Sequence, residues 1–153
     1  MVVALAVGLG GAIGALSRYG LDSAIERRTE SVFPWATFVI NVSGCLAVGF
    51  VIAALVDRQR APQWLRVGLV VGFCGGYTTF STFAQEAFDL VQERDIAIAI
   101  AAIAANVVLG LLAVLVGTRL GRLVWPSFKG RRLHHRPGPA DTPRDGDVAD
   151  PHA

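Results

Sequence analysis

Four long stretches of this sequence contain no Asp, Glu, Lys or Arg, and they limit what the chain can fold into. The stretches cover residues 2–17, 35–56, 67–84 and 96–118. About 20 apolar residues are needed to cross a bilayer as a helix. The last three stretches meet that length, and the first does so if the side chain of Arg18 reaches the headgroups. We therefore expect an all-α, four-transmembrane-helix, multi-pass protein of the cell (plasma) membrane.

The composition changes completely near the end of the fourth stretch. Of the 153 residues, 53% are hydrophobic and 17% are charged, and many of the charges lie after Arg119. The C-terminal segment also carries five prolines, so it cannot bury enough apolar area to fold. We predict a transmembrane domain over residues 1–121 and a basic, Pro-rich, disordered tail over residues 122–153.

The third stretch contains residues that lipid would not tolerate. Gly75 and Gly76 interrupt an apolar run, and four hydroxyl residues follow: Thr78, Thr79, Ser81 and Thr82. Each glycine lowers helix propensity by roughly 1 kcal/mol relative to alanine. Backbone that leaves a helix at membrane depth must face protein, an ion or water. We predict that the third helix is broken over residues 75–79 and that the break forms a site.

Two asparagines are the strongly polar side chains inside the other stretches. Asn41 lies in the second stretch and Asn106 in the fourth. An unpaired amide in hydrocarbon costs roughly 2–7 kcal/mol, so both should face the interior of the bundle. There they either bond one helix to another or line a polar pathway. Phe80 and Phe83 share one helical face, which suits core packing as well as a site.

The first stretch has two features with alternative interpretations. Gly10 and Gly14 form a GxxxG pair, which lets helices approach closely in a membrane. The glycines from Gly8 onward also resemble a dinucleotide-binding loop, but their spacing is one residue too long and no alternating strands follow. Arg18, which ends the stretch, is either an interfacial anchor or a cation at the mouth of an anion pathway.

Three segments together resemble the Fluc (CrcB) family of fluoride channels. They are residues 10–19 (GGAIGALSRY), residues 34–44 (PWATFVINVSG) and, most specifically, residues 72–83 (GFCGGYTTFSTF). The resemblance extends over nearly all of residues 5–121. It implies a fluoride-specific channel built from an antiparallel, dual-topology dimer of four-helix chains with a broken third helix.

The resemblance also assigns roles to single residues. It implies a structural Na⁺ on the dimer axis that is not transported, held by the backbone carbonyls of Gly75 and Thr78 from both chains. It places Phe80 and Phe83 along the fluoride path, together with the pore-facing Asn41. We expect no enzyme activity and no nucleic-acid partner; the expected partners are fluoride, the bilayer and a second subunit.

The residues are consistent with passive fluoride export that lowers the cytoplasmic concentration of the ion. Fluoride is strongly hydrated, so a pore must offer donors such as Asn41, Ser81 and Thr82. Phenylalanine rings present a positive edge to an anion. The uncharged stretches contain no carboxylate, which argues against a small proton-coupled multidrug exporter. A non-transporting membrane scaffold is the other alternative, but it leaves the broken third helix unexplained.

Two features depart from the family pattern. The fourth stretch offers only Asn106, a possible pore or packing residue, and Ala102 stands where a tyrosine is expected, so one of the two pores is predicted to be altered or silent. Cations are also unevenly divided between the two sides of the membrane, which suggests an oppositely oriented paralogue as partner instead of a second copy. One side carries Arg58, Arg60, Arg66, Arg119, Arg122, Lys129, Arg131, Arg132, Arg136 and Arg144; the other carries Arg27, Arg28, Arg94 and, at the membrane edge, Arg18.

Overall fold

The computed structural model describes residues 1–56 and 61–124, and within them it contains helices and no strand. Four spans are long and apolar enough to cross a membrane, which confirms the all-α, four-span prediction. The predicted disorder of the tail concerns residues that, from position 125 onward, lie outside the described ranges. In chain order the elements are α1 (Val2–Glu26), α2 (Trp35–Val51), the π-helix η1 (Ile52–Val56), α3 (Gln63–Val67), the π-helix η2 (Gly68–Cys74), α4 (Gly75–Tyr77), α5 (Phe80–Gln92) and α6 (Ile96–Val124).

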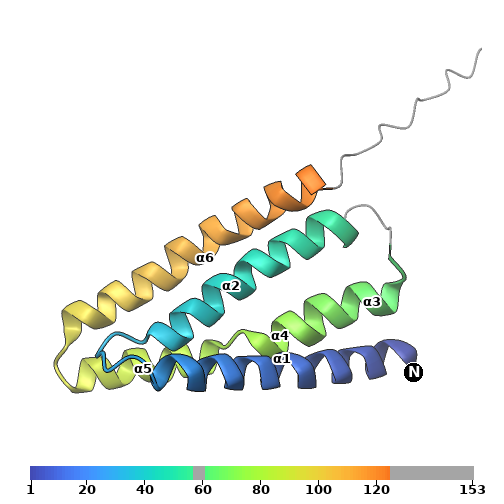
Figure 1. Cartoon of the computed structure of the whole chain (residues 1–153). Coiled ribbons are helices and arrows are strands. Elements are labelled where there is room, and N and C mark those ends of the chain that lie inside the picture. The colour runs from blue at the N-terminus through green and yellow to red at the C-terminus, as the bar shows by residue number, and fades with distance from the viewer. Residues whose placement is uncertain (57–60, 125–153) are drawn as a thin grey trace, which may run out of the picture.

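The spans alternate in direction. The N-terminus, the start of α3 and the end of α6 lie at one end of the bundle, and the start of α2 and the end of α5 lie at the other (Figure 1). Among the described cations, this arrangement puts Arg66, Arg119 and Arg122 at the end opposite Arg27 and Arg94. The division of these charges is therefore the one that the sequence predicts.

Small residues hold α1 against the first half of the third span. A Cβ atom added at Gly14 would meet the carbonyl oxygen of Phe73, and one added at Gly76 would meet the backbone of Gly11. Helix backbones that approach this closely leave no room for a side chain between them. The close approach predicted for the Gly10 and Gly14 pair is therefore confirmed.

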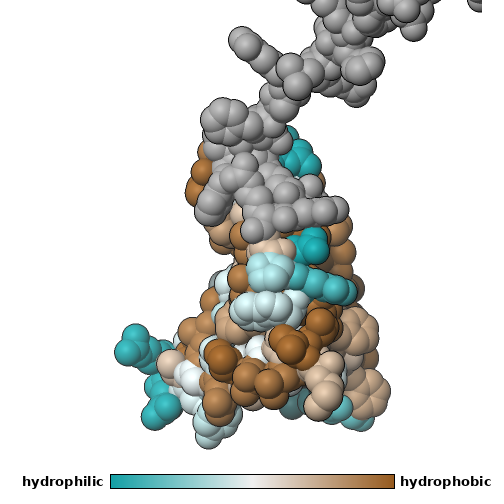
Figure 2. All heavy atoms as spheres, turned by 90° about the vertical axis from the view of Figure 1, so that its right-hand side faces the viewer, coloured by the Kyte–Doolittle hydropathy of each residue, from teal (hydrophilic) through white to brown (hydrophobic). Residues whose placement is uncertain are grey.

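A second pair, α2 with α6, is packed in the same way. Cβ atoms added at Gly49 and Gly117 would meet the carbonyl oxygens of Val114 and Leu46 across the interface. The bundle thus consists of two pairs of helices in close contact. Figure 2 shows many apolar side chains, with some hydrophilic ones, at the end of the bundle. Along the spans, apolar side chains such as Leu111 are 64% exposed, as expected for surfaces that contact lipid.

Three helices are longer than the uncharged stretches indicate. The stretches end at residues 17, 84 and 118, whereas α1 continues to Glu26, α5 to Gln92 and α6 to Val124. Charged side chains at helix ends reach the headgroups and water, so they do not stop a helix. The prediction that the spans contain no carboxylate is consequently wrong, because Glu86 lies within the third span, Gln63–Gln92.

The third span is broken, but over two residues only. Gly75 and Gly76 lie in the helical turn α4, and the chain is extended at Thr78 (ψ 158°) and Thr79 (φ −143°, ψ 123°). The predicted opening at the glycines is wrong, because those residues keep helical geometry and Gly76 provides close packing against α1. Before the break the span packs on α1; after it, α5 packs mainly on α6.

A single added methyl group should have opposite effects at two glycines of α1. We expect Gly14→Ala to destabilise the protein by roughly 1–3 kcal/mol, because the methyl group meets backbone atoms that cannot move aside. Gly8→Ala adds the same group where no atom lies within 4 Å, so it should be neutral or stabilise by up to about 1 kcal/mol. Thermal unfolding of the purified variants in detergent measures both, and equal effects would contradict the packing described here.

Candidate functional site

The broken backbone is bonded to one side chain of α2. The Thr79 N–H donates to Oδ1 of Asn41 at 2.9 Å, and Nδ2 of Asn41 donates to the Thr79 carbonyl at 3.1 Å. An asparagine amide has the same donor and acceptor geometry as a peptide group, so the two form a closed pair. Both polar backbone groups of Thr79 are satisfied without a helix, as membrane depth requires.

The same bonds leave two carbonyls without their helical donors. In an α-helix the carbonyl of Gly75 would accept from the N–H of Thr79, but that N–H is bonded to Asn41. The carbonyl of Thr78 would accept from the N–H of Thr82, which instead donates to Oγ1 of Thr79 at 3.1 Å. These are the two carbonyls to which the family resemblance assigns the Na⁺.

The face of α4 at Gly75 is open. A Cβ atom added at Gly75 would meet nothing within 4 Å, so this face of α4 is uncovered in the single chain. Carbonyl oxygens are ligands that hard cations such as Na⁺ prefer. The donor chemistry at Gly75 and Thr78 therefore fits a monovalent cation.

An open pocket of about 260 Å³, here the break pocket, brings together some of the predicted pore residues from three spans; Ser81 and Thr82 do not line it. Phe80 and Phe83 line it from α5, with ring centroids 5.9 Å apart and ring planes inclined by 50°. The Phe80 side chain is 79% exposed in the single chain. The complete lining is Asn41, Cys45, Thr78, Thr79, Phe80, Phe83, Asn106 and Val107.

Asn106 contacts Asn41 inside this pocket. Nδ2 of Asn41 lies 3.4 Å from Oδ1 of Asn106, and Nδ2 of Asn106 donates to the Ala102 carbonyl at 3.0 Å. Both amide hydrogens of Asn41 therefore point to protein acceptors, Thr79 and Asn106. Asn106 thus bonds α6 to α2 at the break and lines the break pocket, while its pore role stays a prediction.

Arg18 lies on a second pocket, of about 230 Å³, on the other side of the break. This arginine pocket is lined by Arg18, Tyr19, Asp22, Thr37, Ile40, Thr79 and Thr82. Thr79 lines both pockets, and its Oγ1 contacts the hydroxyls of Thr82 at 2.9 Å and Ser81 at 3.3 Å. Hydroxyl groups thus continue from the break toward the arginine.

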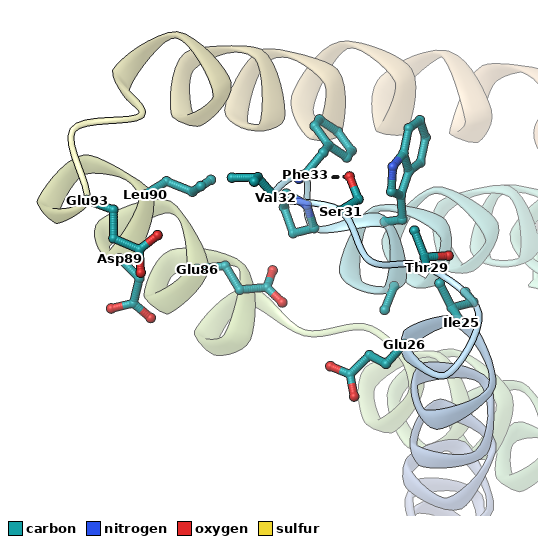
Figure 3. Close-up of a pocket in the computed structure, with 13 residues that line it drawn as sticks. Ile25, Glu26, Thr29, Ser31, Val32, Phe33, Glu86, Asp89, Leu90 and Glu93 are labelled. Carbon is teal, nitrogen blue, oxygen red and sulfur yellow. Dashed lines mark hydrogen bonds between the residues drawn. The ribbon is translucent and has the colours of Figure 1, made fainter.

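A third pocket, of about 280 Å³, is acidic and lies where α1, α2 and α5 end or begin. The side chains of Glu26 and Glu86 project toward the same opening, with Asp89 and Glu93 further along α5 (Figure 3). Oε1 of Glu86 accepts a 2.8 Å hydrogen bond from Thr37, which also lines the arginine pocket. Carboxylates repel anions, so this pocket disfavours them, whereas the arginine pocket combines one cation, Arg18, with one carboxylate, Asp22.

The sequence analysis missed several functional positions. Thr79 was included in the break but not assigned a role, although a threonine just before an amphipathic helix is a recognisable N-cap signal. Tyr77, whose hydroxyl lies 2.9 Å from Oγ of Ser43, and the Thr37–Glu86 contact carry no local signal. They depend on how α2 lies against the third span.

Comparison with known proteins gives one consistent result. The family model described as "CrcB-like protein, Camphor Resistance (CrcB)" matches residues 5–118. A protein of Solibacter usitatus named "Fluoride-specific ion channel FluC" is 44% identical over 118 residues, which cover 77% of this chain and 97% of that protein.

Two further relatives carry the same kind of name. "Fluoride-specific ion channel FluC" of Chloroflexus aurantiacus (strain ATCC 29366) is 42% identical over 118 residues, 77% of this chain and 94% of that protein. "Fluoride-specific ion channel FluC 1" of Nitrobacter hamburgensis is 39% identical over 120 residues, 78% of this chain and 95% of that protein. The matched residues include all four spans, and this chain is therefore a member of the CrcB-like family of multi-pass membrane proteins.

Proposed function

We propose that this chain forms a passive, fluoride-specific ion channel that exports fluoride and lowers its cytoplasmic concentration. The observation that carries the proposal is the break at Thr78–Thr79, whose bonded backbone lies between a phenylalanine-lined pocket and an arginine-lined pocket. The names of the relatives, which are fluoride-specific channels, support the choice of ion.

The anion pathway runs from the arginine pocket along hydroxyl groups to the phenylalanines. Arg18 raises the local anion concentration at the mouth. The hydroxyls of Ser81 and Thr82 replace water around fluoride, and the edges of Phe80 and Phe83 offer positive charge without an acceptor. Both amide hydrogens of Asn41 are already donated, to the Thr79 carbonyl and to Oδ1 of Asn106. To donate to fluoride, Asn41 gives up one of these two hydrogen bonds.

The carbonyls of Gly75 and Thr78 are the proposed ligands of a structural Na⁺. Both are released from helical bonding by named groups, Asn41 and the Thr79 hydroxyl. A bound Na⁺ supplies positive charge at the midpoint of the bundle, and it is not transported. Two carbonyls are too few ligands for the ion, so the proposed site needs the same two carbonyls from a second chain.

The second chain is proposed to lie antiparallel to the first. In the single chain Gly75 and Phe80 are exposed on the outer surface of the bundle, and polar backbone there would otherwise face lipid. The excess of cations at one end favours a fixed orientation, so a paralogue of opposite orientation is the alternative to a second copy.

Proton coupling is the second candidate mechanism, because Glu86 is half-buried within a span and bonded to Thr37. An exporter driven by protons needs an ionisable group in the membrane, and Glu86, near the end of the third span, is the candidate for it. A passive channel differs because it conducts fluoride when the fluoride gradient alone is present.

Reconstitution of the purified chain without a partner tests the proposed channel. We expect fluoride to leave liposomes down its own gradient, with a protonophore collapsing any proton gradient, while chloride stays inside. Phe80→Ile should abolish this efflux by removing an aromatic edge from the path. Asn41→Asp should do the same, because a carboxylate cannot donate to Thr79 and repels anions.

Phe88→Ile is the matched control for Phe80→Ile, since Phe88 is an exposed phenylalanine of α5 outside the three pockets. It should conduct like the wild type. Efflux that requires a proton gradient would contradict the proposed channel and favour a proton-coupled carrier. Chloride efflux equal to that of fluoride would contradict the proposed specificity for fluoride. Efflux that appears only after a paralogue is added would assign the second subunit to that paralogue.

The Thr79 hydroxyl should control the response of the protein to Na⁺. Thr79→Ala removes the acceptor of the Thr82 N–H, so that N–H can bond to the Thr78 carbonyl and close the helix; the lost cap also costs about 1 kcal/mol. We expect Na⁺ to raise the unfolding temperature of the wild type but not of Thr79→Ala. Thr79→Ser keeps the cap and should keep the response.

The measurement compares thermal unfolding in NaCl with unfolding in N-methylglucamine chloride at equal ionic strength. A wild-type protein that unfolds at the same temperature in both salts would contradict the proposed Na⁺ site. If Na⁺ raises the unfolding temperature of Thr79→Ala as much as that of the wild type, the Thr79 hydroxyl is not needed to form the Na⁺ site.

A further inference from the structure

Tyr77 is held on three sides at the residue that precedes the break. Its ring is stacked on that of Phe73, with centroids 5.8 Å apart and planes inclined by 6°. A Cβ atom added at Gly44 of α2 would lie 3.2 Å from Cδ1 of Tyr77, so the ring lies directly against the α2 backbone. A Cβ atom added at Gly14 of α1 would lie 2.9 Å from the backbone nitrogen of Tyr77, so α1 also lies directly against this residue.

The tyrosine hydroxyl makes a hydrogen bond to α2. Oγ of Ser43 lies 2.9 Å from the Tyr77 hydroxyl and 3.1 Å from the Ile40 carbonyl. While the single proton of Ser43 is donated to that carbonyl, Tyr77 is the donor to Ser43. The phenol thus ties α4 to α2.

This bond and the Asn41 pair lie on either side of Thr78. Asn41 fixes the peptide groups of Thr79, and Tyr77 fixes the residue before Thr78. Thr78 itself is held by its N–H and Oγ1, which both donate to the Cys74 carbonyl, at 3.0 and 2.9 Å. The direction of the Thr78 carbonyl therefore depends on both anchors, and Tyr77 is the anchor that belongs to no pocket lining described above.

We infer that Tyr77, through its hydrogen bond to Ser43, is a positioning residue for the Thr78 carbonyl and sets the affinity of the break for Na⁺ and its preference for Na⁺ over K⁺. The inference rests on the proposed Na⁺ site. A carbonyl that is held rigidly favours the cation that fits its position, whereas a loosened carbonyl adapts to larger cations. Loss of the tyrosine hydroxyl should therefore weaken Na⁺ binding and reduce the discrimination against K⁺.

The test measures the Na⁺ and K⁺ concentrations that give half of the maximal rise in unfolding temperature of the purified full chain. Tyr77→Phe removes the hydroxyl and keeps the ring that stacks on Phe73; Ser43→Ala removes the acceptor from the α2 side. Each should raise the half-effective Na⁺ concentration about two- to tenfold, the range of one neutral hydrogen bond, and bring the Na⁺ and K⁺ values closer together.

The double variant and a control separate positioning from general damage. Tyr77→Phe with Ser43→Ala should shift the Na⁺ value no further than either single change, because both remove the same bond. Ser17→Ala is the matched control, since Ser17 is an exposed serine that bonds the Ile13 carbonyl of its own helix; it should leave the value unchanged. Fluoride efflux of Ser17→Ala should also stay close to that of the wild type.

An unchanged half-effective Na⁺ concentration in Tyr77→Phe would overturn the inference, as would additive shifts in the double variant. A wild-type chain that responds to Na⁺ but passes no fluoride would contradict the proposed channel and leave the role of Tyr77 intact. A wild-type chain without any Na⁺ response would overturn both the Na⁺ site and the inference.

Discussion

The pairing of the Asn41 amide with the Thr79 peptide is the interaction on which the rest of the structure depends. Two extended residues in the middle of a membrane span would expose backbone groups to lipid, at a cost of several kcal/mol for each unsatisfied group. One side chain of α2 satisfies both groups of Thr79. The break can therefore exist as a stable feature, and the carbonyl of Gly75 loses its helical donor in the same step.

The break also determines how the bundle is assembled. Glycines bring α1 against η2 and α4, and a second set brings α2 against α6. A straight third span would continue along α1, whereas the turn at Thr78–Thr79 directs α5 toward α6. As a result Phe80 and Phe83 of α5 line the same pocket as Asn106 of α6 and Asn41 of α2.

Charges are unevenly distributed around this assembly. Arg18 lies on one pocket together with hydroxyl groups and Asp22, and Glu26, Glu86, Asp89 and Glu93 line another. Thr37 touches both regions, since it lines the arginine pocket and donates to Glu86. Because Glu86 lies within the third span, an absence of carboxylates does not support passive conduction. The support for it comes from the break and from the family.

The sequence by itself determined the number of spans, their alternation and the region of the site. Long uncharged stretches can satisfy their backbone in lipid only as helices, and polar residues around Thr78 in such a stretch have to face something other than lipid. Helix ends were predicted less well, because Glu26 and Gln92 extend into water without breaking a helix. The reason for the break was also misjudged: Gly76 is small because α1 passes against it, not because the helix opens there.

Tertiary structure alone decided which groups meet. Asn41 and Thr79 are 38 residues apart, and Ser43 and Tyr77 are 34 apart; no local pattern pairs them. Their contacts depend on the register of α2 against the third span, which is set by close backbone packing over many residues. Composition therefore fixed that this chain crosses the membrane four times, and packing between the spans fixed which carbonyls are released and where the pockets lie.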